Sequence, residues 1–288
     1  MIPAHNILTG VANKIPLPAV YHSIRGLIVR RDATIDDFVE VVELDSALAL
    51  RIIRMANSQF FGYSRKVNTV KEAISLIGTI QLHDLLLSSL AIRAFSGIPL
   101  ELINQQEFWR CSIYCGITAR LLAKKCELPA SERLFTAGLL HEIGHLVMYA
   151  QIPEQMQEIC FELQESYKPQ HQLERERIGF DYGQVGCEIM RLWHLPENYC
   201  DIVRNHMEPT KPSDIKLELE VVNLARSIML AKEGNLKQTG YSILNSADSL
   251  ISKKVKIQDA EQIAHNALPF VGEVMDCLCP LFKPREIS

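Results

Sequence analysis

The sequence predicts an all-α fold, and three observations lead to that prediction. Apolar residues recur at the three- and four-residue spacing of an amphipathic helix through most of the 288-residue chain. No segment alternates apolar and polar residues over the length of a β-strand. Capping residues, prolines and glycines divide the chain into segments of ordinary helix length. We therefore expect helices joined by short turns throughout.

Composition argues against several classes of function. Hydrophobic residues make up 48% of the chain and charged residues 22%, which is ordinary for a globular protein. The net charge is −4 and no dense basic block occurs, so nucleic acid is not an expected partner. The N-terminus lacks the basic and apolar regions of a signal peptide, and no apolar run is long enough to cross a bilayer. We therefore expect a cytoplasmic protein with no membrane segment, whose eight cysteines are reduced and mostly buried.

The first third of the chain contains start and stop signals for successive helices. Thr34 and Asp37 resemble a capping box, and Ser46 can cap the helix that follows. After an aromatic turn, Asn68 or Thr69 begins another helix, which Gly78 ends. The expected helices span about residues 19–31, 35–44, 46–57, 69–77 and 82–95.

A candidate hinge at residues 97–99 precedes the second part of the chain. We expect the charged run 168–177 to be solvated, and Asp181 with Gln184 to cap the helix after it. Residues 208–212 form a second linker. The expected helices span about residues 108–125, 132–149, 153–167, 182–193, 196–206, 214–233, 257–266 and 268–280.

The expected helix 132–149 carries two imidazoles and a carboxylate inside an apolar run. On one helix, His141 and His145 would lie on the same face. The H-E-x-x-H pattern is typical of zinc peptidases, in which Glu142 would act as the general base. Glu162 or Glu165 would then have to supply a third ligand. Hydrogen-bonded histidines that bind no metal remain the alternative at this point.

Other motifs occur on both sides of this helix. They include IPLPAV at residues 15–20, DSALALRIIRMANS at 45–58, AISLIG at 73–78, GLLHEIG at 138–144, WHLP at 193–196 and HMEP at 206–209. In this order they resemble the HDOD family, the HD-related output domain of bacterial signalling, over about residues 13–210. The resemblance implies an N-terminal helical lobe (about 13–97) packed on a degenerate HD lobe (about 104–210). We expect residues 213–288 to form a helical extension packed on the HD-like lobe.

The resemblance also implies where the chain departs from an active HD enzyme. Cys111 stands at the position of the first metal-binding His, and Glu142 replaces the Asp that follows His141. Tyr182 occupies a position where many relatives carry His. Arg226 lies about where an enzyme would place its last Asp, and a cation there would repel a metal ion.

Four residues remain as a candidate polar pocket: His141, Glu142, His145 and His206. His145 takes a place that Lys or His often fills in active relatives, and His206 could close on the same pocket. We expect His141 and Glu142 to be buried at the base of a cleft between the two lobes.

The expected function is that of a non-catalytic regulatory protein, which needs no metal or cofactor and binds other signalling proteins. Self-association is left open. One alternative is a metal-dependent HD-type phosphohydrolase or phosphodiesterase that uses the four pocket residues as a non-standard ligand set. A less favoured alternative is the zinc peptidase, because it would make the surrounding motifs a coincidence.

Overall fold

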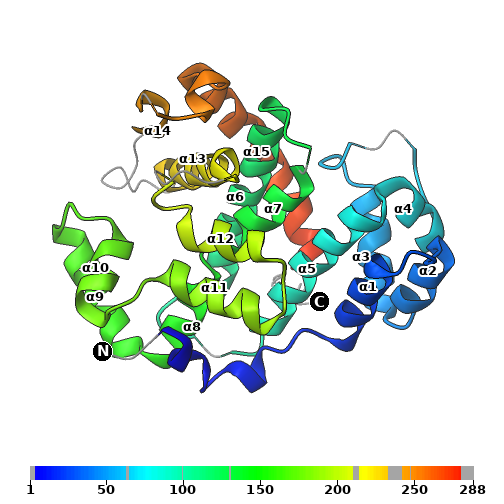
Figure 1. Cartoon of the computed structure of the whole chain (residues 1–288), viewed down its shortest axis with the longest axis horizontal. Coiled ribbons are helices and arrows are strands. Elements are labelled where there is room, and N and C mark those ends of the chain that lie inside the picture. Colours follow the sequence, from blue (N-terminus) through cyan, green and yellow to red (C-terminus); the bar gives the residue numbers. More distant parts are fainter. Residues whose placement is uncertain are drawn as a thin grey trace, which may run out of the picture. The chain divides into compact units, whose positions relative to one another are not determined.

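A computed structural model describes residues 4–62, 65–98, 100–129, 131–209, 214–232, 242–246 and 248–279. These residues form helices joined by turns, with no β-strand among them, which confirms the predicted all-α fold (Figure 1). Pro99 and residues 210–212, predicted as parts of the two linkers, lie outside the described residues.

The chain divides into two compact units, which we describe separately. Unit 1 contains the residues up to Pro16 together with Ile98–Leu268, and unit 2 contains Leu17–Gly97 together with the residues from Pro269 onward. The division falls inside the last helix, α15 (Ile257–Leu278), which has Pro269 in its interior. The two helices predicted at residues 257–266 and 268–280 are therefore one.

The expected extension 213–288 does not group wholly with the HD-like part of the chain. Its last section belongs to unit 2, where the Glu273 carboxylate accepts hydrogen bonds from the backbone N–H groups of Gln59 (2.8 Å) and Phe60 (3.3 Å). The rings of Phe60 and Phe270 also lie 5.6 Å apart. The end of the expected extension therefore groups with unit 2, while the packing of residues 213–288 on the HD-like lobe stays a prediction.

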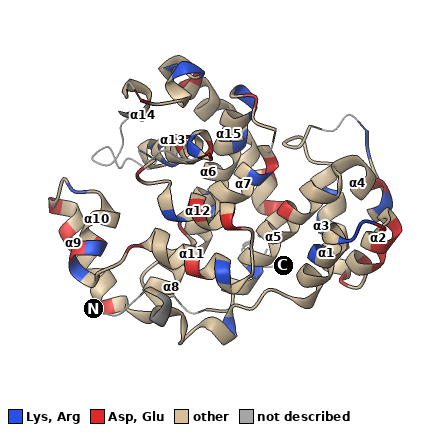
Figure 2. Cartoon of the chain, viewed as in Figure 1, with Lys and Arg blue, Asp and Glu red and all other residues tan. Residues whose placement is uncertain are grey.

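Unit 2 is built around the helix α5 (Thr79–Phe95), whose residues 82–92 are all buried. Its helices are α1 (Ala19–Val29), α2 (Ile35–Glu43), α3 (Ser46–Ala56), α4 (Val70–Ile77) and α5 (Thr79–Phe95). The capping box of Thr34 and Asp37 is present, whereas Asp45 rather than Ser46 caps α3. Gly78 joins α4 to α5 at a φ of 90°, where an L-residue would be strained. The Asp and Glu residues of α2 are coloured red in Figure 2.

Unit 1 contains the remaining helices, among which α6 and α7 pack closely against each other. A Cβ added at Gly138 would lie 3.0 Å from the Cα of Gly116, so the two helices need glycine where they meet. The elements of unit 1 before α15 are η1 (Ala4–Leu8), η2 (Ala12–Lys14), α6 (Gln105–Lys125), α7 (Ser131–Leu140), α8 (Ile143–Gln151), α9 (Pro153–Glu165), α10 (Gln170–Ile178), α11 (Tyr182–Leu192), α12 (Glu197–Asn205), α13 (Lys216–Lys232), α14 (Ser242–Asn245) and η3 (Ile251–Lys253).

The predicted central helix 132–149 is in fact two helices. α7 ends at Leu140, α8 begins at Ile143, and His141 and Glu142 form the turn between them. A Cβ at Gly144 would lie only 2.0 Å from the carbonyl oxygen of Tyr182. Gly144 therefore permits the close approach of α8 to α11, in addition to weakening a continuous helix.

The charged run 168–177 is not simply solvated, and that prediction is wrong. Most of it forms α10, which buries His171, Leu173 and Glu174. Other charges of the run are exposed, and Lys168, just before the helix, pairs with Glu176 at 2.7 Å. The helix is therefore half core and half surface, although its composition is almost entirely polar.

No single helix in the described part of the chain combines the length and hydropathy needed to cross a bilayer. The helices Val70–Ile77 and Thr79–Phe95 meet the criterion only together, and they are bent by 110° relative to one another.

Candidate functional site

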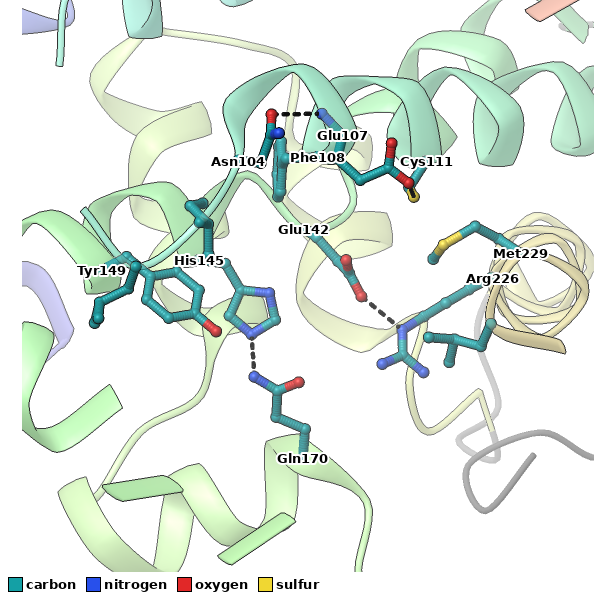
Figure 3. A pocket seen from close by; sticks show the side chains of 13 residues that line it. Asn104, Glu107, Phe108, Cys111, Glu142, His145, Tyr149, Gln170, Arg226 and Met229 are labelled. Atoms are coloured by element: carbon teal, nitrogen blue, oxygen red, sulfur yellow. Dashed lines mark hydrogen bonds and ion pairs between the residues drawn. The ribbon is translucent and has the colours of Figure 1, made fainter. Parts of the chain in front are cut away.

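A pocket of about 430 Å³ opens beside the break between α7 and α8 (Figure 3). The N-terminus of α6, the turn before α8, α10 and α13 all contribute to its walls. The lining residues are Leu102, Ile103, Asn104, Glu107, Phe108, Cys111, Glu142, His145, Tyr149, Gln170, Arg226, Met229 and Leu230. All of them belong to unit 1, so this pocket does not test the cleft expected between two lobes.

An ion pair between Glu142 and Arg226 forms the charged part of the pocket. The Nε of Arg226 donates to Oε1 of Glu142 at 3.1 Å, and the side chains are 11% and 17% exposed, respectively. Burial opposes the charge on Glu142, but the charges of His141 and Arg226 outweigh it and lower the pKa of Glu142 to about 2. The guanidinium also lies 5.8 Å from the centre of the Tyr182 ring. A protein cation is therefore in place beside the carboxylate that a metal ion would need.

His141 is completely buried and uses only one of its ring nitrogens. Nδ1 donates to the carbonyl oxygen of Gly138 at 2.6 Å. Nε2 has no hydrogen-bond partner among the described residues, and it lies 3.7 Å from Oε1 of Glu142. Burial lowers the pKa of His141 to about 4, although Glu142 partly offsets that effect. At neutral pH the ring is uncharged and its Nε2 lone pair is unused.

His145 belongs to a second charged pair, with a partner that the sequence analysis missed. Its Nε2 donates to Oε1 of Glu174 at 2.8 Å, and Glu174 is completely buried. Burial lowers the pKa of His145, but the charge of Glu174 and the hydrogen bond outweigh it, so the pKa is raised overall. Gln170 also donates to Oε1 of Glu174, at 3.0 Å, while the backbone N–H of Tyr182 donates to Oε2 at 2.9 Å.

The spacing of residues in α10 contained a sequence signal that Glu174 lies on the buried side of the helix. Leu173 and Glu174 follow Gln170 by three and four residues, which places them on the side of the helix that faces α8. A strongly polar composition hid that pattern. Only the contact with His145 on α8 shows that the Glu174 carboxylate is not solvated.

His206 and Tyr182 lie behind the pocket wall. Both are completely buried, and the Tyr182 hydroxyl lies 3.3 Å from Nε2 of His206. Nδ1 of His206 donates to the carbonyl oxygen of Val203 at 2.9 Å, and its ring centre is 5.3 Å from that of His141. Burial, reinforced by His141, lowers the pKa of His206 well below its usual value. Thus His141 and His206 meet, but neither lines the pocket.

Cys111 lies on the pocket wall and is half-buried, whereas Cys115, one turn further along α6, is buried in the core. The Cys111 thiol lies 3.9 Å from Oε1 of Glu107. The expectation that the cysteines are mostly buried therefore holds for Cys115, whereas Cys111 contacts a charged side chain and the pocket.

The residues present do not fit a metal ion. Within the described ranges, no group of three or more His, Cys, Asp or Glu side chains is arranged to hold one. The Glu142 carboxylate is paired with Arg226, and the Nε2 atoms of His145 and His206 already contact Glu174 and Tyr182, respectively.

The zinc-peptidase interpretation depended on one helix carrying both histidines, and that prediction is wrong. The break at residues 141–142 removes the shared face. Of the two suggested third ligands, Glu162 accepts a hydrogen bond from Nε of Arg177 at 2.7 Å, so its carboxylate is engaged elsewhere.

The described residues form an all-helical fold in which a His–acid turn lies beside a pocket. The HDOD domain model matches residues 15–209, and the chain belongs to the HDOD family. The chain is 25% identical over 220 residues to an uncharacterised protein of Treponema pallidum (strain Nichols). That match covers 76% of this chain but only 42% of the relative's length.

Solved structures share the fold. An HDOD domain protein of unknown function from Geobacter sulfurreducens aligns with a TM-score of 0.71 and 18% identity, covering 98% of this chain and 99% of that one. A candidate signal transduction protein from Marinobacter aquaeolei VT8 aligns with a TM-score of 0.69 and 22% identity, covering 93% of this chain and 60% of that one. A candidate phosphohydrolase from Shewanella amazonensis SB2B aligns with a TM-score of 0.69 and 20% identity, covering 94% of this chain and 96% of that one.

Proposed function

We propose that this chain is a non-catalytic regulatory protein of bacterial signal transduction, which binds other signalling proteins in the cytoplasm and uses no metal or cofactor. Membership of the HDOD family and the fold shared with a candidate signal transduction protein support a role in signalling. The absence of catalysis rests on the chemistry of the HD-like site.

The observation that carries this proposal is the ion pair of Arg226 with Glu142 at 3.1 Å. A divalent cation at Glu142 would have to approach a buried guanidinium, and the repulsion between the two charges would be weakly screened there. Displacing Arg226 would leave a buried charge without its partner, which costs about 3–5 kcal/mol. The guanidinium supplies the positive charge that the carboxylate needs for stability, but it cannot activate a water molecule as a metal ion does.

A hydrolysis assay with matched variants tests the proposal. Purified protein with Mn²⁺ is incubated with cyclic dinucleotides and with nucleoside phosphates, alongside His141→Ala and the surface control Arg177→Gln. We expect no turnover above the protein-free rate for any of the three. Turnover that is lost in His141→Ala and kept in Arg177→Gln would overturn the proposal.

One observation favours the HD-type phosphohydrolase as a second candidate. The buried Nε2 of His141 has no hydrogen-bond partner among the described residues, and an unsatisfied buried nitrogen is unusual. Elemental analysis of protein purified without chelator separates the two functions. Stoichiometric Fe, Mn or Zn that is lost in His141→Ala would favour the enzyme, and a metal-free sample would favour the regulatory protein.

A further inference from the structure

We propose that the pocket beside Glu142 and Arg226 binds a small zwitterion with an apolar body, of the class of the larger apolar α-amino acids. The inference rests on the proposed function in one respect, namely that Arg226 and not a metal ion neutralises Glu142. It adds a ligand to a protein otherwise proposed to act only on protein partners.

The polar end of the ligand is defined by the atoms that the ion pair leaves unused. Arg226 contacts Glu142 through Nε, and within the described residues its two terminal nitrogens make no hydrogen bond. Oε2 of Glu142 is likewise without a described partner. Both side chains line the pocket and point toward one another in Figure 3. Two donors from a guanidinium suit a carboxylate, and the adjacent carboxylate oxygen suits an ammonium group.

Charge balance favours a ligand with no net charge. Glu142 is paired with Arg226, His145 with Glu174, and Glu107 with Arg110 at 2.6 Å. The described pocket walls therefore offer no uncompensated cation to a multiply charged nucleotide. A zwitterion instead matches one positive and one negative group without leaving either buried charge unpaired.

The apolar end of the ligand is defined by side chains from α6, α13 and the segment before α6. Phe108, Met229 and Leu230 line the pocket together with Leu102 and Ile103, and Leu102 is 40% exposed in the described residues. A volume of about 430 Å³ with mostly apolar walls and a few polar groups is typical of a small-molecule site. A ligand with a charged head alone would leave these apolar walls in water.

Calorimetric titration in the presence of EDTA tests the ligand class. L-leucine, L-methionine and L-phenylalanine are the probes. Glycine lacks the apolar body, 4-methylpentanoate lacks the ammonium group, and 3-methylbutylamine lacks the carboxylate. We expect saturable binding of at least one apolar amino acid and affinities weaker by about tenfold or more for the three truncated compounds, which corresponds to about 1.4 kcal/mol. AMP and GMP are included as competing classes.

Paired variants locate the site. Glu142→Gln with Arg226→Gln removes both charges without leaving one buried charge alone, and we expect it to fold and to lose at least about tenfold in affinity. Arg177→Gln, on the surface of α10, should bind as the parent does. The ¹³C-methyl NMR signal of Met229, identified by its absence in Met229→Leu, should shift on binding.

The inference would be overturned by no binding of any apolar amino acid to the folded parent, by tighter binding of AMP or GMP, or by unchanged binding in the folded double variant. Equal binding of 4-methylpentanoate would also overturn it, because the ammonium group would then have no role. Since the titration is made in EDTA, a positive hydrolysis assay with Mn²⁺ would count against the proposed function and not against this binding result.

Discussion

Two places in this sequence have a histidine directly before an acidic residue, one in each unit, and the surroundings of the two pairs differ. In unit 2, His83 donates from Nδ1 to Asp84 at 3.0 Å and accepts at Nε2 from the Tyr21 hydroxyl at 2.9 Å. In unit 1, His141 donates from Nδ1 to a carbonyl oxygen but leaves Nε2 without a described partner. The first pair is inside α5, and the second lies at a helix break beside a pocket.

The difference teaches how to separate a structural His–acid pair from a degenerate site. A buried polar group is stable when each of its hydrogen-bonding atoms has a partner. The Tyr21–His83–Asp84 chain meets that condition and needs nothing from outside the protein. The His141–Glu142 pair meets it only in part. Arg226, far away in sequence, pairs with Glu142, but Nε2 of His141 has no hydrogen-bond partner among the described residues.

The largest expected effect comes from removing the guanidinium of Arg226. Arg226→Met should lower the free energy of unfolding by about 3–5 kcal/mol, because Glu142 would then be a largely buried charge without a partner. Urea unfolding followed by circular dichroism measures the loss. Adding Glu142→Gln should recover part of it, since the uncompensated charge is removed as well. If Arg226→Met alone were neutral, Glu142 would have to be solvated or paired with another cation.

Replacing each histidine by alanine sharpens the comparison. His83→Ala should destabilise by about 3 kcal/mol because both Tyr21 and Asp84 lose a partner, at about 1–3 kcal/mol for each group. His141→Ala should destabilise less, by about 1–2 kcal/mol, because only the carbonyl of Gly138 loses one. Thermal and urea unfolding of both variants provide the measurement. A His141→Ala, Glu142→Ala double variant that melts at or above the parent would show that the pair is kept for chemistry.

The pH dependence of stability should identify His141 separately. Its pKa is about 4 when folded and about 6.5 when unfolded, so between these values the unfolded chain binds the additional proton. Stability contributed by the neutral ring is present above pH 6.5 and is lost as pH falls toward 4. From pH 7 to pH 5 the loss should be about 2 kcal/mol.

The control for this pH experiment is His141→Gln, which does not titrate and whose amide can still donate to Gly138. Its unfolding free energy should fall less between pH 7 and pH 5 than that of the parent. Identical pH profiles would mean that His141 titrates normally in the folded protein.

The smallest expected effects come from two tyrosine hydroxyls. Tyr21→Phe should cost about 1 kcal/mol, because it removes the 2.9 Å hydrogen bond to His83. Tyr182→Phe should cost about half as much, since its contact with His206 is longer, at 3.3 Å. Urea midpoints of the two variants, compared with the parent, test the order. If Tyr182→Phe lowered stability more than Tyr21→Phe, the Tyr182 hydroxyl would contribute more to stability than its longer contact with His206 predicts.

Local signals in the sequence determined the all-α fold and many helix starts. The capping boxes at Thr34 and Asp181 join residues three positions apart, so a linear pattern contains everything needed to predict them. The family motifs likewise occur in a fixed order along the chain and led to the HDOD family without coordinates. These features depend on neighbours in sequence, which is why sequence alone was sufficient.

Only the tertiary structure decided how the site is neutralised. The resemblance placed Arg226 near the site, and the spacing of α10 held a signal for the burial of Glu174. The partners of these two residues are 84 and 29 residues away in sequence, so no local pattern identifies Glu142 as the partner of Arg226 or His145 as the partner of Glu174. The break of the central helix also depends on a distant partner, since Gly144 lies against the backbone of Tyr182. A polar residue in a charged run is buried or solvated according to what packs over it. That choice is made by long-range contacts, whose energies favour one arrangement of helices that already form locally.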